Sequence, residues 1–279
     1  MTIHTSPAST IRSLTLADID RMRLRLDPDF DVCAIERVVT GYPGRSLWDS
    51  RNLEVIVVGP WRHRHDVASV VGMKSVRAAR QLVLEAMRRA ECFGAEAFLM
   101  LEWDERRNPA FYEALGLDLL DSVIPYERQL TSSDFPGYGS YLDDLVSLSA
   151  EDIPELIGVD NSAFPWLWIN NRDEFIEYLD NEAVRIVGHR IDGRLVSYLG
   201  FTSFGQWGHI DRIAVRPEMQ RRGLGKRLMF AAFELLRQYG ATTVGLSTQK
   251  SNWKSQRLYQ QLGFRRTRQN SYRVYGTRL

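Results

Sequence analysis

The 279-residue chain repeats one series of sequence features in each half, and this repeat limits the folds that it can adopt. The stretch "SLTLADIDRM" begins at Ser13, and "SLSAEDIPEL" begins at Ser147. In each stretch a hydroxyl side chain, Thr15 or Ser149, stands three residues before an aspartate. Because such a pair caps the start of a helix, the sequence predicts the same step from strand to helix twice.

The ends of the two halves match as well. "NPAFYEALGLDLL" starts at Asn108 and "SQRLYQQLGFRRT" starts at Ser255, and each contains a tyrosine followed by Leu-Gly and an apolar residue. Gly116 and Gly263 stand where a short helix is predicted to end. A glycine suits the left-handed cap that closes such a helix.

An amphipathic helical pattern and then an apolar strand precede each of these ends. The helical patterns finish in Phe-Gly-Ala at residues 93–95 and in Tyr-Gly-Ala at residues 239–241, and the strands read "EAFLMLEW" and "TTVGLSTQ". Matching features in one order favour a duplication over a chance similarity of two α/β segments. The sequence therefore predicts two similar α/β domains.

A stretch rich in Ser, Gly, Pro and Asp separates the two halves. It reads "TSSDFPGYGS", residues 131–140, and is typical of a linker. The predicted organisation is a disordered N-terminus at residues 1–10, a first domain at 11–130, the linker at 131–140 and a second domain at 141–279.

Composition and charge argue against several classes of protein. A net charge of +1 does not suit a general nucleic-acid or membrane-surface binder. The N-terminus is polar, without the apolar core of a signal peptide, and no apolar run approaches the roughly 20 residues that span a bilayer. Cys33 and Cys92 are expected to be buried thiols rather than a disulfide. Free thiols fit a reducing compartment, so the predicted location is the cytoplasm.

The stretch "QRRGLGKRLM", residues 220–229, lies between a predicted strand and a predicted helix. Along that strand, His209, Asp211 and the two odd-numbered residues after them are expected to share one face. Gly223 and Gly225 bring free backbone N–H groups and the positive end of the helix to a place that a pyrophosphate can approach closely. A tight strand-helix connection with solvated charges is the alternative.

The segment from Gln220 to Gly225 resembles the Gln/Arg-x-x-Gly-x-Gly/Ala signature of the GNAT superfamily, the acyl-CoA-dependent N-acyltransferases. "NWKSQRLYQQLGF", from Asn252, resembles the loop and helix after that family's fifth strand. The resemblance covers the chain from about Ser140 and implies acetyl-CoA as cofactor. It also implies an α/β (α+β) fold with two GNAT-like domains, each a mixed central sheet flanked by helices. The coenzyme-binding residues that it implies are Ile213, Ala214, Val215, Gln220, Arg221, Arg222, Gly223, Leu224, Gly225, Lys226, Asn252 and Ser255.

The first half departs from this motif where it is expected to bind the coenzyme. Arg77 and Ala79 stand in the places of the two glycines, and their side chains would crowd a backbone that must touch phosphate. Glu105 stands near the place of the motif's asparagine. We therefore predict that the first domain is a degenerate GNAT-like copy without a coenzyme site.

The resemblance implies an N-acetyltransferase that transfers an acetyl group directly from acetyl-CoA to a primary amine. Tyr259 matches the family's general acid, although a tyrosine that packs between helix and sheet is the alternative. The backbone near Val215 is the implied donor to the oxyanion. His209 aligns with a strand position where some members carry a base, and Asp211 is expected on the same face. A His or Asp that is paired across the sheet is the alternative.

The acceptor is predicted to be an amine of a small molecule or a peptide. Phe164, Trp166 and Trp168 lie where the family's first two helices form the acceptor wall, and they are expected either to line a cleft or to anchor a helix pair. His63 and His65 lack a third ligand, so no metal is predicted.

Two other functions stay open at the level of sequence. A non-catalytic acyl-CoA-binding sensor or interaction module could keep the glycine turn without turnover, although Asn252 and Tyr259 favour the enzyme. A nucleic-acid binder that uses the Arg-rich turn would show salt-sensitive binding that coenzyme A does not displace.

Overall fold

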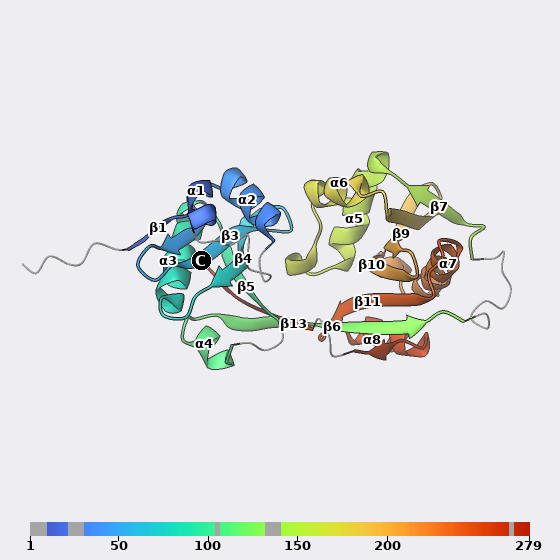
Figure 1. The fold of residues 1–279 in the computed structure, drawn as a ribbon. Coiled ribbons are helices and arrows are strands. Elements are labelled where there is room, and N and C mark those ends of the chain that lie inside the picture. Colours follow the sequence, from blue (N-terminus) through green and yellow to red (C-terminus); the bar gives the residue numbers. More distant parts are fainter. Residues whose placement is uncertain (1–9, 22–30, 104–106, 132–140, 268–270) are drawn as a thin grey trace, which may run out of the picture. The chain divides into compact units, whose positions relative to one another are not determined.

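The protein is represented by a computed structural model that describes residues 10–21, 31–103, 107–131, 141–267 and 271–279. It divides into two compact units: unit 1 contains Met1–Asp121 and Tyr272–Leu279, and unit 2 contains Ser122–Ser271. In both units helices flank a mixed sheet (Figure 1), so the predicted α/β fold class is confirmed.

The first series of elements runs from β1 to β6. Its members are β1 (Ile11–Ser13), α1 (Leu16–Arg21), α2 (Val32–Gly41), β2 (Leu47–Asp49), β3 (Glu54–Trp61), β4 (Arg64–Lys74), α3 (Ala79–Cys92), β5 (Ala97–Trp103), α4 (Pro109–Glu113) and β6 (Asp118–Gln129). The sheet of unit 1 has the strand order β1-β2-β3-β4-β5-β13, in which β13 is Tyr272–Arg278. In this sheet β4 and β5 are parallel, and the other neighbours are antiparallel.

The second series repeats the first, strand for strand and α-helix for α-helix, up to its last strand, which is broken in two. Its members are β7 (Leu145–Leu148), η3 (Ala150–Asp152), α5 (Ile153–Ala163), η4 (Trp166–Trp168), α6 (Arg172–Asp180), β8 (Val184–Ile191), β9 (Arg194–Phe204), β10 (Trp207–Val215), η5 (Pro217–Met219), α7 (Leu224–Gln238), β11 (Thr243–Gln249), α8 (Trp253–Gln261) and β12 (Arg265–Arg266), with β13 after it. The sheet of unit 2 has the order β7-β8-β9-β10-β11-β6. Here β10 and β11 are the parallel pair.

Both predicted helix starts are present. The Asp18 carboxylate accepts hydrogen bonds from the Thr15 N–H at 3.0 Å and from the Thr15 hydroxyl at 2.6 Å. Ser149 and Asp152 form a reciprocal capping box. These bonds satisfy N–H groups that a helix start otherwise leaves unpaired, which explains why the pattern recurs.

Both predicted glycine caps are present as well. Gly116 has a φ of +73° and Gly263 a φ of +80°, each in the left-handed region that favours glycine. In each half, the N–H of the next residue donates to the carbonyl of the helical tyrosine, Tyr112 or Tyr259, at 3.0 Å. The same short helix is thus closed in the same way twice.

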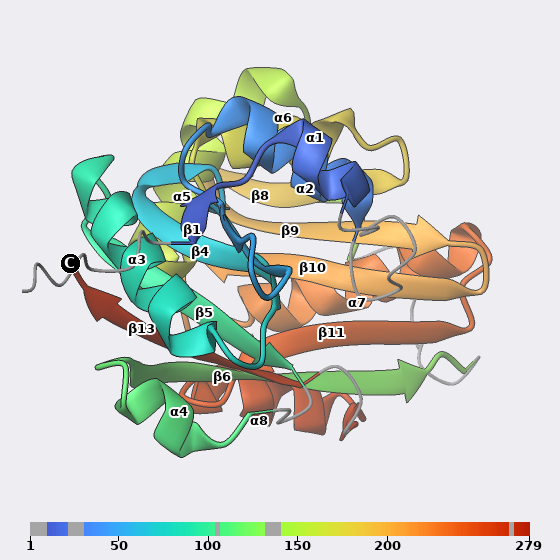
Figure 2. The ribbon, with the colours of Figure 1, turned by 60° about the vertical axis from the view of Figure 1, so that its left-hand side comes forward.

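The last strand of each series completes the sheet of the other unit. β6 follows α4 but pairs along residues 123–129 with β11 in unit 2. β13 follows α8 but pairs along all seven of its residues with β5 in unit 1. The colours make this plain: green β6 lies beside orange-red β11, and dark red β13 lies beside teal β5 (Figures 1 and 2). This exchange explains why the units divide at residues 121/122 and 271/272. Most of the linker predicted at 131–140 and nearly all of the predicted disordered N-terminus lie outside the described residues.

The surface differs from the sequence prediction at the two thiols. Cys33 and Cys92 are free, but both are exposed, so the prediction that they are buried is wrong.

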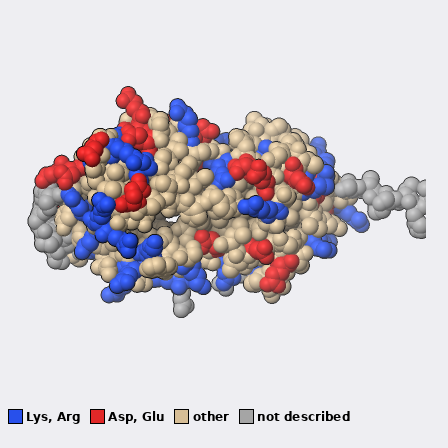
Figure 3. All heavy atoms as spheres, turned by 180° about the vertical axis from the view of Figure 1, so that it is seen from behind, with Lys and Arg blue, Asp and Glu red and all other residues tan. Residues whose placement is uncertain are grey.

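Lys and Arg side chains and Asp and Glu side chains both occur on the visible face of each unit (Figure 3). Within the described ranges, the structure contains no helix that has the length and apolar character needed to cross a membrane.

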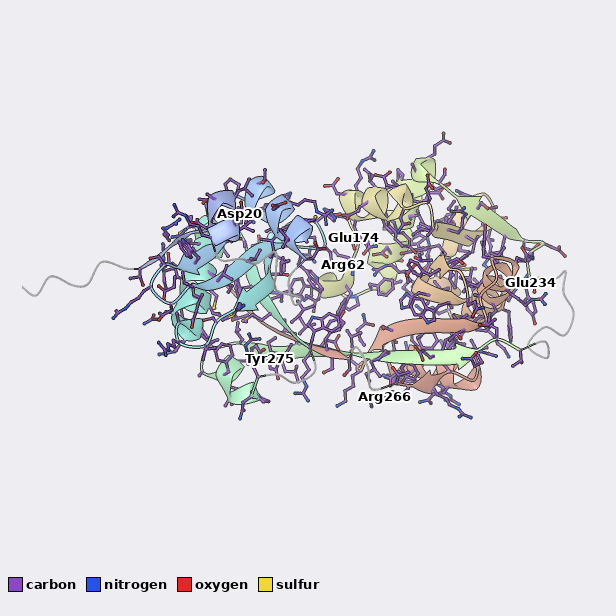
Figure 4. All side chains as sticks on the ribbon, viewed as in Figure 1. Asp20, Arg62, Glu174, Glu234, Arg266 and Tyr275 are labelled. Atoms are coloured by element: carbon purple, nitrogen blue, oxygen red, sulfur yellow. The ribbon has the colours of Figure 1, made fainter. Side chains whose placement is uncertain are left out.

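The strand exchange predicts which part of the fold depends on the C-terminal residues. Tyr275 on β13 (Figure 4) is 4% exposed and stacks on Tyr112 with ring centroids 3.8 Å apart. We expect Tyr275→Ala to cost about 3–5 kcal/mol of stability, the usual cost of removing a buried aromatic ring. Hydrogen exchange should speed up on β5 of unit 1 and stay slow on β10 of unit 2. Arg278→Ala, on the same strand but exposed, is the control; unchanged exchange on β5 in Tyr275→Ala would contradict the pairing.

Candidate active site

The start of α7 in unit 2 has the backbone geometry of an anion-binding site. Gly223 caps this helix with a φ of +85°, a conformation that residues with a Cβ rarely adopt. In the described part of the chain, no side chain caps this helix start, so its first backbone N–H groups are left for another partner. The Gln220 side-chain amide donates to the Val215 carbonyl at 3.1 Å and ties the turn to the end of β10.

Packing inside the chain does not explain the second glycine. A Cβ on Gly225 would meet only Leu258 Cδ2 at 3.7 Å and Val215 Cγ2 at 3.9 Å, which are ordinary contacts. A Cβ on Gly223 would meet nothing within 4 Å. Arg221, Arg222 and Lys226 of the turn are exposed. The turn therefore offers open backbone, positive charge and the positive end of a helix, which together fit a pyrophosphate.

β10 leaves β11 before it reaches this turn. Their parallel register covers Trp207–Ile210, whereas in the described structure Ile213–Val215 is paired with β9. The N–H of Arg216 donates to the Val196 carbonyl on β9 at 2.9 Å. Because successive N–H groups along a strand point to opposite sides, the Val215 N–H faces away from β9, toward the side from which β11 has diverged.

Tyr259 lies on α8, and a local network fixes its position. The Asn252 side-chain oxygen accepts the Ser255 N–H at 3.2 Å and caps α8. Tyr259 is 4% exposed. Burial raises the pKa of Tyr259 to about 12, against the opposing effect of a hydrogen bond with the Ser255 side chain. The structure thus brings these three predicted residues together and keeps the phenol protonated.

A β-bulge changes the faces of β10. The register of β10 against β9 shifts between Ile210 and Arg212. As a result, Asp211 contacts Tyr178 of α6 and Arg212 contacts Asp160 of α5, while Ile213 packs into the cluster that contains α7. His209 Nδ1 lies 2.7 Å from Asp211 Oδ1, so these two share a face as predicted. The expectation that Ile213 shares that face is wrong, because simple alternation does not survive a bulge.

Two residues that the sequence reasoning missed complete this cluster. The Tyr178 hydroxyl donates to Asp211 Oδ2 at 2.5 Å, and the Thr202 hydroxyl donates to the same oxygen at 2.6 Å. Tyr178 lies on α6, 33 residues before Asp211. No local pattern signals such a contact, although Thr202 could be found from the pairing of β9 with β10.

A buried ion pair holds the connection between α5 and α6 onto β10. Arg212 contacts Asp160 through Nε at 2.5 Å and Nη2 at 2.9 Å, and Nη2 also donates to the Trp168 carbonyl at 2.5 Å. The guanidinium lies 3.8 Å from the centre of the Phe164 ring. Asp160 is fully buried and also accepts the Tyr198 hydroxyl.

The three predicted acceptor residues therefore have different surroundings. Phe164 stacks on Arg212, Trp168 is 4% exposed in the interior, and Trp166 is 46% exposed. Phe164 and Trp168 anchor the segment between the helices, as the alternative reading of these aromatics expects. Trp166 presents the largest accessible ring of the three.

In unit 1 a carboxylate binds the backbone directly before the corresponding helix. α3 takes the place in the first series that α7 takes in the second. Glu54 on β3 accepts the N–H groups of Arg77 at 2.8 Å and Ala78 at 2.7 Å, together with the Ser75 hydroxyl. Burial alone would raise the pKa of Glu54, but these hydrogen bonds outweigh it and hold that pKa below its usual value. Sequence reasoning missed Glu54 because it lies more than 20 residues before the backbone that it binds.

In unit 1, the tyrosine that corresponds to Tyr259 is also bound by a carboxylate. The Tyr112 hydroxyl donates to the Glu102 carboxylate on β5, and both residues are buried. Arg107 holds the same carboxylate through its N–H and its guanidinium. Burial, followed by the charge and hydrogen bond of Glu102, raises the pKa of Tyr112. Glu105, which stands near the place of Asn252, lies outside the described residues.

The described ranges were compared with the arrangements of side chains that hold metal ions. No group of three or more His, Cys, Asp or Glu residues there is arranged to hold a metal ion. His63 sits in the β3–β4 turn with a φ of +56°, and the His65 ring lies 5.7 Å from that of Tyr42.

Comparison with known proteins gives a family match for part of the chain. Residues 145–264 match the model of the acetyltransferase (GNAT) family. This segment contains the glycine turn, the bulged strand and the buried tyrosine, so the resemblance inferred from the motifs is confirmed for it. Acetyl-CoA is the acyl donor of this family, and the start of α7 fits its pyrophosphate.

Individual relatives are distant. An N-alpha-acetyltransferase of Sulfurisphaera tokodaii is 30% identical over 104 residues, an alignment that spans 33% of this chain and 62% of that relative. A GCN5-related N-acetyltransferase of Sphaerobacter thermophilus is 16% identical with a TM-score of 0.60, over 96% of this chain and 95% of that one. A tandem GNAT protein from the clavulanic acid pathway is 14% identical with a TM-score of 0.54, over 81% of this chain and 78% of that one. The structural likeness establishes a shared fold.

The Tyr259 environment predicts a pH dependence of stability. The phenol has a pKa near 12 in the folded chain and 10.0 when it is free. Its stabilising contribution is therefore fully present below pH 10 and is lost as the pH rises through 12. We expect the difference in free energy of unfolding between wild type and Tyr259→Phe to fall by about 2–3 kcal/mol over this interval. Urea denaturation at several pH values measures it, and a constant difference would contradict a buried, protonated Tyr259.

Proposed function

We propose that the C-terminal half, residues 141–279, is an N-acetyltransferase that transfers an acetyl group directly from acetyl-CoA to a primary amine of a small molecule or a peptide. One observation carries the proposal: α7 starts at a left-handed glycine, with open backbone, immediately after β10 has diverged from β11. This arrangement lies inside the segment that matches the acetyltransferase family.

The proposed coenzyme site consists of the turn and the two elements beside it. Gly223, Leu224, Gly225 and Lys226 would bind the pyrophosphate through backbone N–H groups and positive charge, with Gln220, Arg221 and Arg222 at its edge. The room for a Cβ at Gly225 supports this role, because a glycine that packing does not require is explained by a ligand that comes close. The pantetheine arm would lie along the following residues: Ile213, Ala214, Val215, Asn252 and Ser255.

Each step of the chemistry has a residue proposed for it. Acetyl-CoA supplies a thioester as acyl donor. His209, backed by Asp211, would take a proton from the ammonium form of the acceptor, so that the amine lone pair is free to attack the carbonyl carbon. The Val215 N–H would donate to the carbonyl oxygen as negative charge develops on it. When the carbon–sulfur bond breaks, Tyr259 would give its phenolic proton to the leaving thiolate.

The acceptor is proposed to contact Trp166 on the accessible side of the α5–α6 connection. Phe164 and Trp168, which were predicted beside it, would act indirectly by fixing that connection through Arg212. A peptide N-terminus is supported by the relative named N-alpha-acetyltransferase. A cytoplasmic location stays a prediction from the sequence.

The alternative function is an acyl-CoA-binding sensor without turnover. Release of free thiol from acetyl-CoA distinguishes the two, measured with a panel of antibiotics, polyamines, amino acids and peptide N-termini. An enzyme releases thiol only with its acceptor, and Tyr259→Phe should lower that rate while coenzyme affinity stays similar. A sensor binds acetyl-CoA but does not release thiol with any amine of the panel.

The glycine turn predicts the effect of one substitution on coenzyme binding. Gly223→Asp adds a Cβ and a negative charge beside the pyrophosphate, so the Kd for coenzyme A should rise tenfold or more, about 1.4 kcal/mol. Gly193→Asp is a matched control, because Gly193 has a φ of +75°, also has nothing within 4 Å of an added Cβ, and lies in the β8–β9 turn. Calorimetry measures both; equal affinity in the two variants would place the coenzyme elsewhere.

We also propose that the N-terminal half is a degenerate GNAT-like copy without a coenzyme site. The repeated order of elements, the matching caps and the likeness to a tandem GNAT protein support a duplication. The carboxylate of Glu54 already takes the N–H groups that a phosphate would use, which adds a reason beyond the missing glycines.

This proposal predicts one acetyl-CoA per chain. Calorimetry should give a stoichiometry of one, and the affinity of this single site should be weakened by Gly223→Asp and unchanged by Arg77→Ala. Glu54→Ala should lower the stability of unit 1 by about 1–3 kcal/mol, because it leaves the N–H groups of Arg77 and Ala78 without their acceptor. Two equivalent sites per wild-type chain would show that α3 binds phosphate despite Glu54.

A further inference from the structure

Asp211 joins side chains from three elements of unit 2. Its Oδ1 lies 2.7 Å from His209 Nδ1 on the same strand. Its Oδ2 accepts the hydroxyls of Tyr178 on α6 and Thr202 on β9, at 2.5 and 2.6 Å. Two donors thus hold one carboxylate oxygen and turn the other toward the imidazole. The carboxylate cannot rotate without breaking at least one of these bonds.

The sheet leaves room for Tyr178 to reach this carboxylate. A Cβ at Gly200 of β9 would lie 2.6 Å from the Tyr178 hydroxyl, and the two next nearest atoms also belong to the Tyr178 ring. Burial, with the charge of Asp211 as the next cause, raises the pKa of Tyr178, so this hydroxyl stays a donor. Gly200 and Tyr178 therefore form one fitted contact between β9 and α6.

The His209 ring is also held from the side. Trp207 stacks on it with centroids 5.4 Å apart and an interplanar angle of 28°. A Cβ at Gly245 on β11 would lie 2.8 Å from Trp207 Cζ2 and at an ordinary contact distance of 3.5 Å from His209 Cδ2, so this glycine makes room for the Trp207 ring. The His209 side chain is 27% exposed. With Nδ1 facing Asp211, Nε2 is the nitrogen that faces away from the carboxylate.

We propose that Tyr178 and Thr202 are positioning residues, which orient Asp211 so that His209 carries its proton on Nδ1 and presents an unprotonated Nε2. This inference rests on the proposed function, in which His209 accepts the proton of the acceptor amine. The proton would move from the amine nitrogen to Nε2, the amine would keep the electron pair for its attack, and the imidazolium would face the Asp211 carboxylate.

The reason is that the tautomer of a histidine follows the hydrogen bond of its other nitrogen. A carboxylate accepts and does not donate, so an ionised Asp211 favours a proton on Nδ1. Tyr178 and Thr202 donate to Oδ2, and they hold the carboxylate in the orientation that leaves Oδ1 toward the imidazole. Loss of either hydroxyl frees Asp211 to rotate, and the imidazole then loses its fixed partner.

The test combines a spectroscopic measurement with kinetics. Nitrogen NMR of the full chain, at a pH where His209 is neutral, reports which ring nitrogen carries the proton. In wild type we expect the Nδ1–H tautomer, and in Tyr178→Phe and Thr202→Val we expect a mixture of the two. With the acceptor found in the amine panel, kcat should fall about ten- to hundredfold, the effect of losing one hydrogen bond to a charged group. The KM for acetyl-CoA should stay unchanged.

Two further variants make the result specific. Gly200→Ala keeps the Tyr178 hydroxyl but pushes it away from Asp211, so it should reproduce the tautomer mixture of Tyr178→Phe. Tyr239→Phe is the control, because Tyr239 is 47% exposed and lies beside Phe201, which faces the α7 cluster.

The outcomes separate this inference from the proposed function. An unchanged tautomer in Tyr178→Phe and Thr202→Val overturns the inference, whatever the activity. A tautomer mixture with unchanged kcat overturns it as well, since the orientation of His209 would not matter. A tautomer mixture in a protein that acetylates no amine supports the positioning of His209 and contradicts the acetyltransferase.

Discussion

The exchange of β6 and β13 is the constraint on which both units depend. Each unit receives a strand beside its buried tyrosine from the other series of elements. In unit 2, Tyr126 of β6 lies 6.2 Å from the Tyr259 ring; in unit 1, Tyr275 of β13 stacks on Tyr112. The environment that raises the pKa of Tyr259 is therefore built partly by a strand that precedes residues 141–279 in the chain.

The two helix starts differ in what lies against the backbone at each of them. α3 and α7 begin at the same place in their series and face the same need, because the first N–H groups of a helix have no partner within it. In unit 1, Glu54 accepts the N–H groups of Arg77 and Ala78, directly before α3. At α7, Gly223 opens the backbone instead. A carboxylate and a phosphate compete for the same kind of donor, so the Glu54 carboxylate agrees with the proposal that only unit 2 binds the coenzyme.

The sequence predicted features that depend on neighbouring residues and missed those that depend on distant ones. Capping boxes and left-handed glycines follow from local backbone chemistry, so Ser149 and Gly263 were found from spacing alone. The bulge at Asp211 depends on the register of β10 against β9, which no local pattern encodes. Tyr178 and Glu54 contact partners that are distant in the sequence. The strands β6 and β13 each pair with the sheet of the other series, and no residue pattern in either strand indicates which of the two similar sheets it joins. Such long-range pairing can be identified only from the folded structure.

The bulge also joins the two halves of the candidate site. By placing Asp211 and Arg212 on one face, it lets a single strand hold both α6, through Tyr178, and the α5–α6 connection, through Asp160. Arg212 and Asp160 are a buried pair, and removal of one partner from such a pair costs roughly 3–5 kcal/mol because the other charge is left without compensation. A regular strand would turn Arg212 toward α7 and leave Asp160 alone. The bulge that makes a prediction by simple alternation fail thus holds the α5–α6 connection and the His209 network in one geometry.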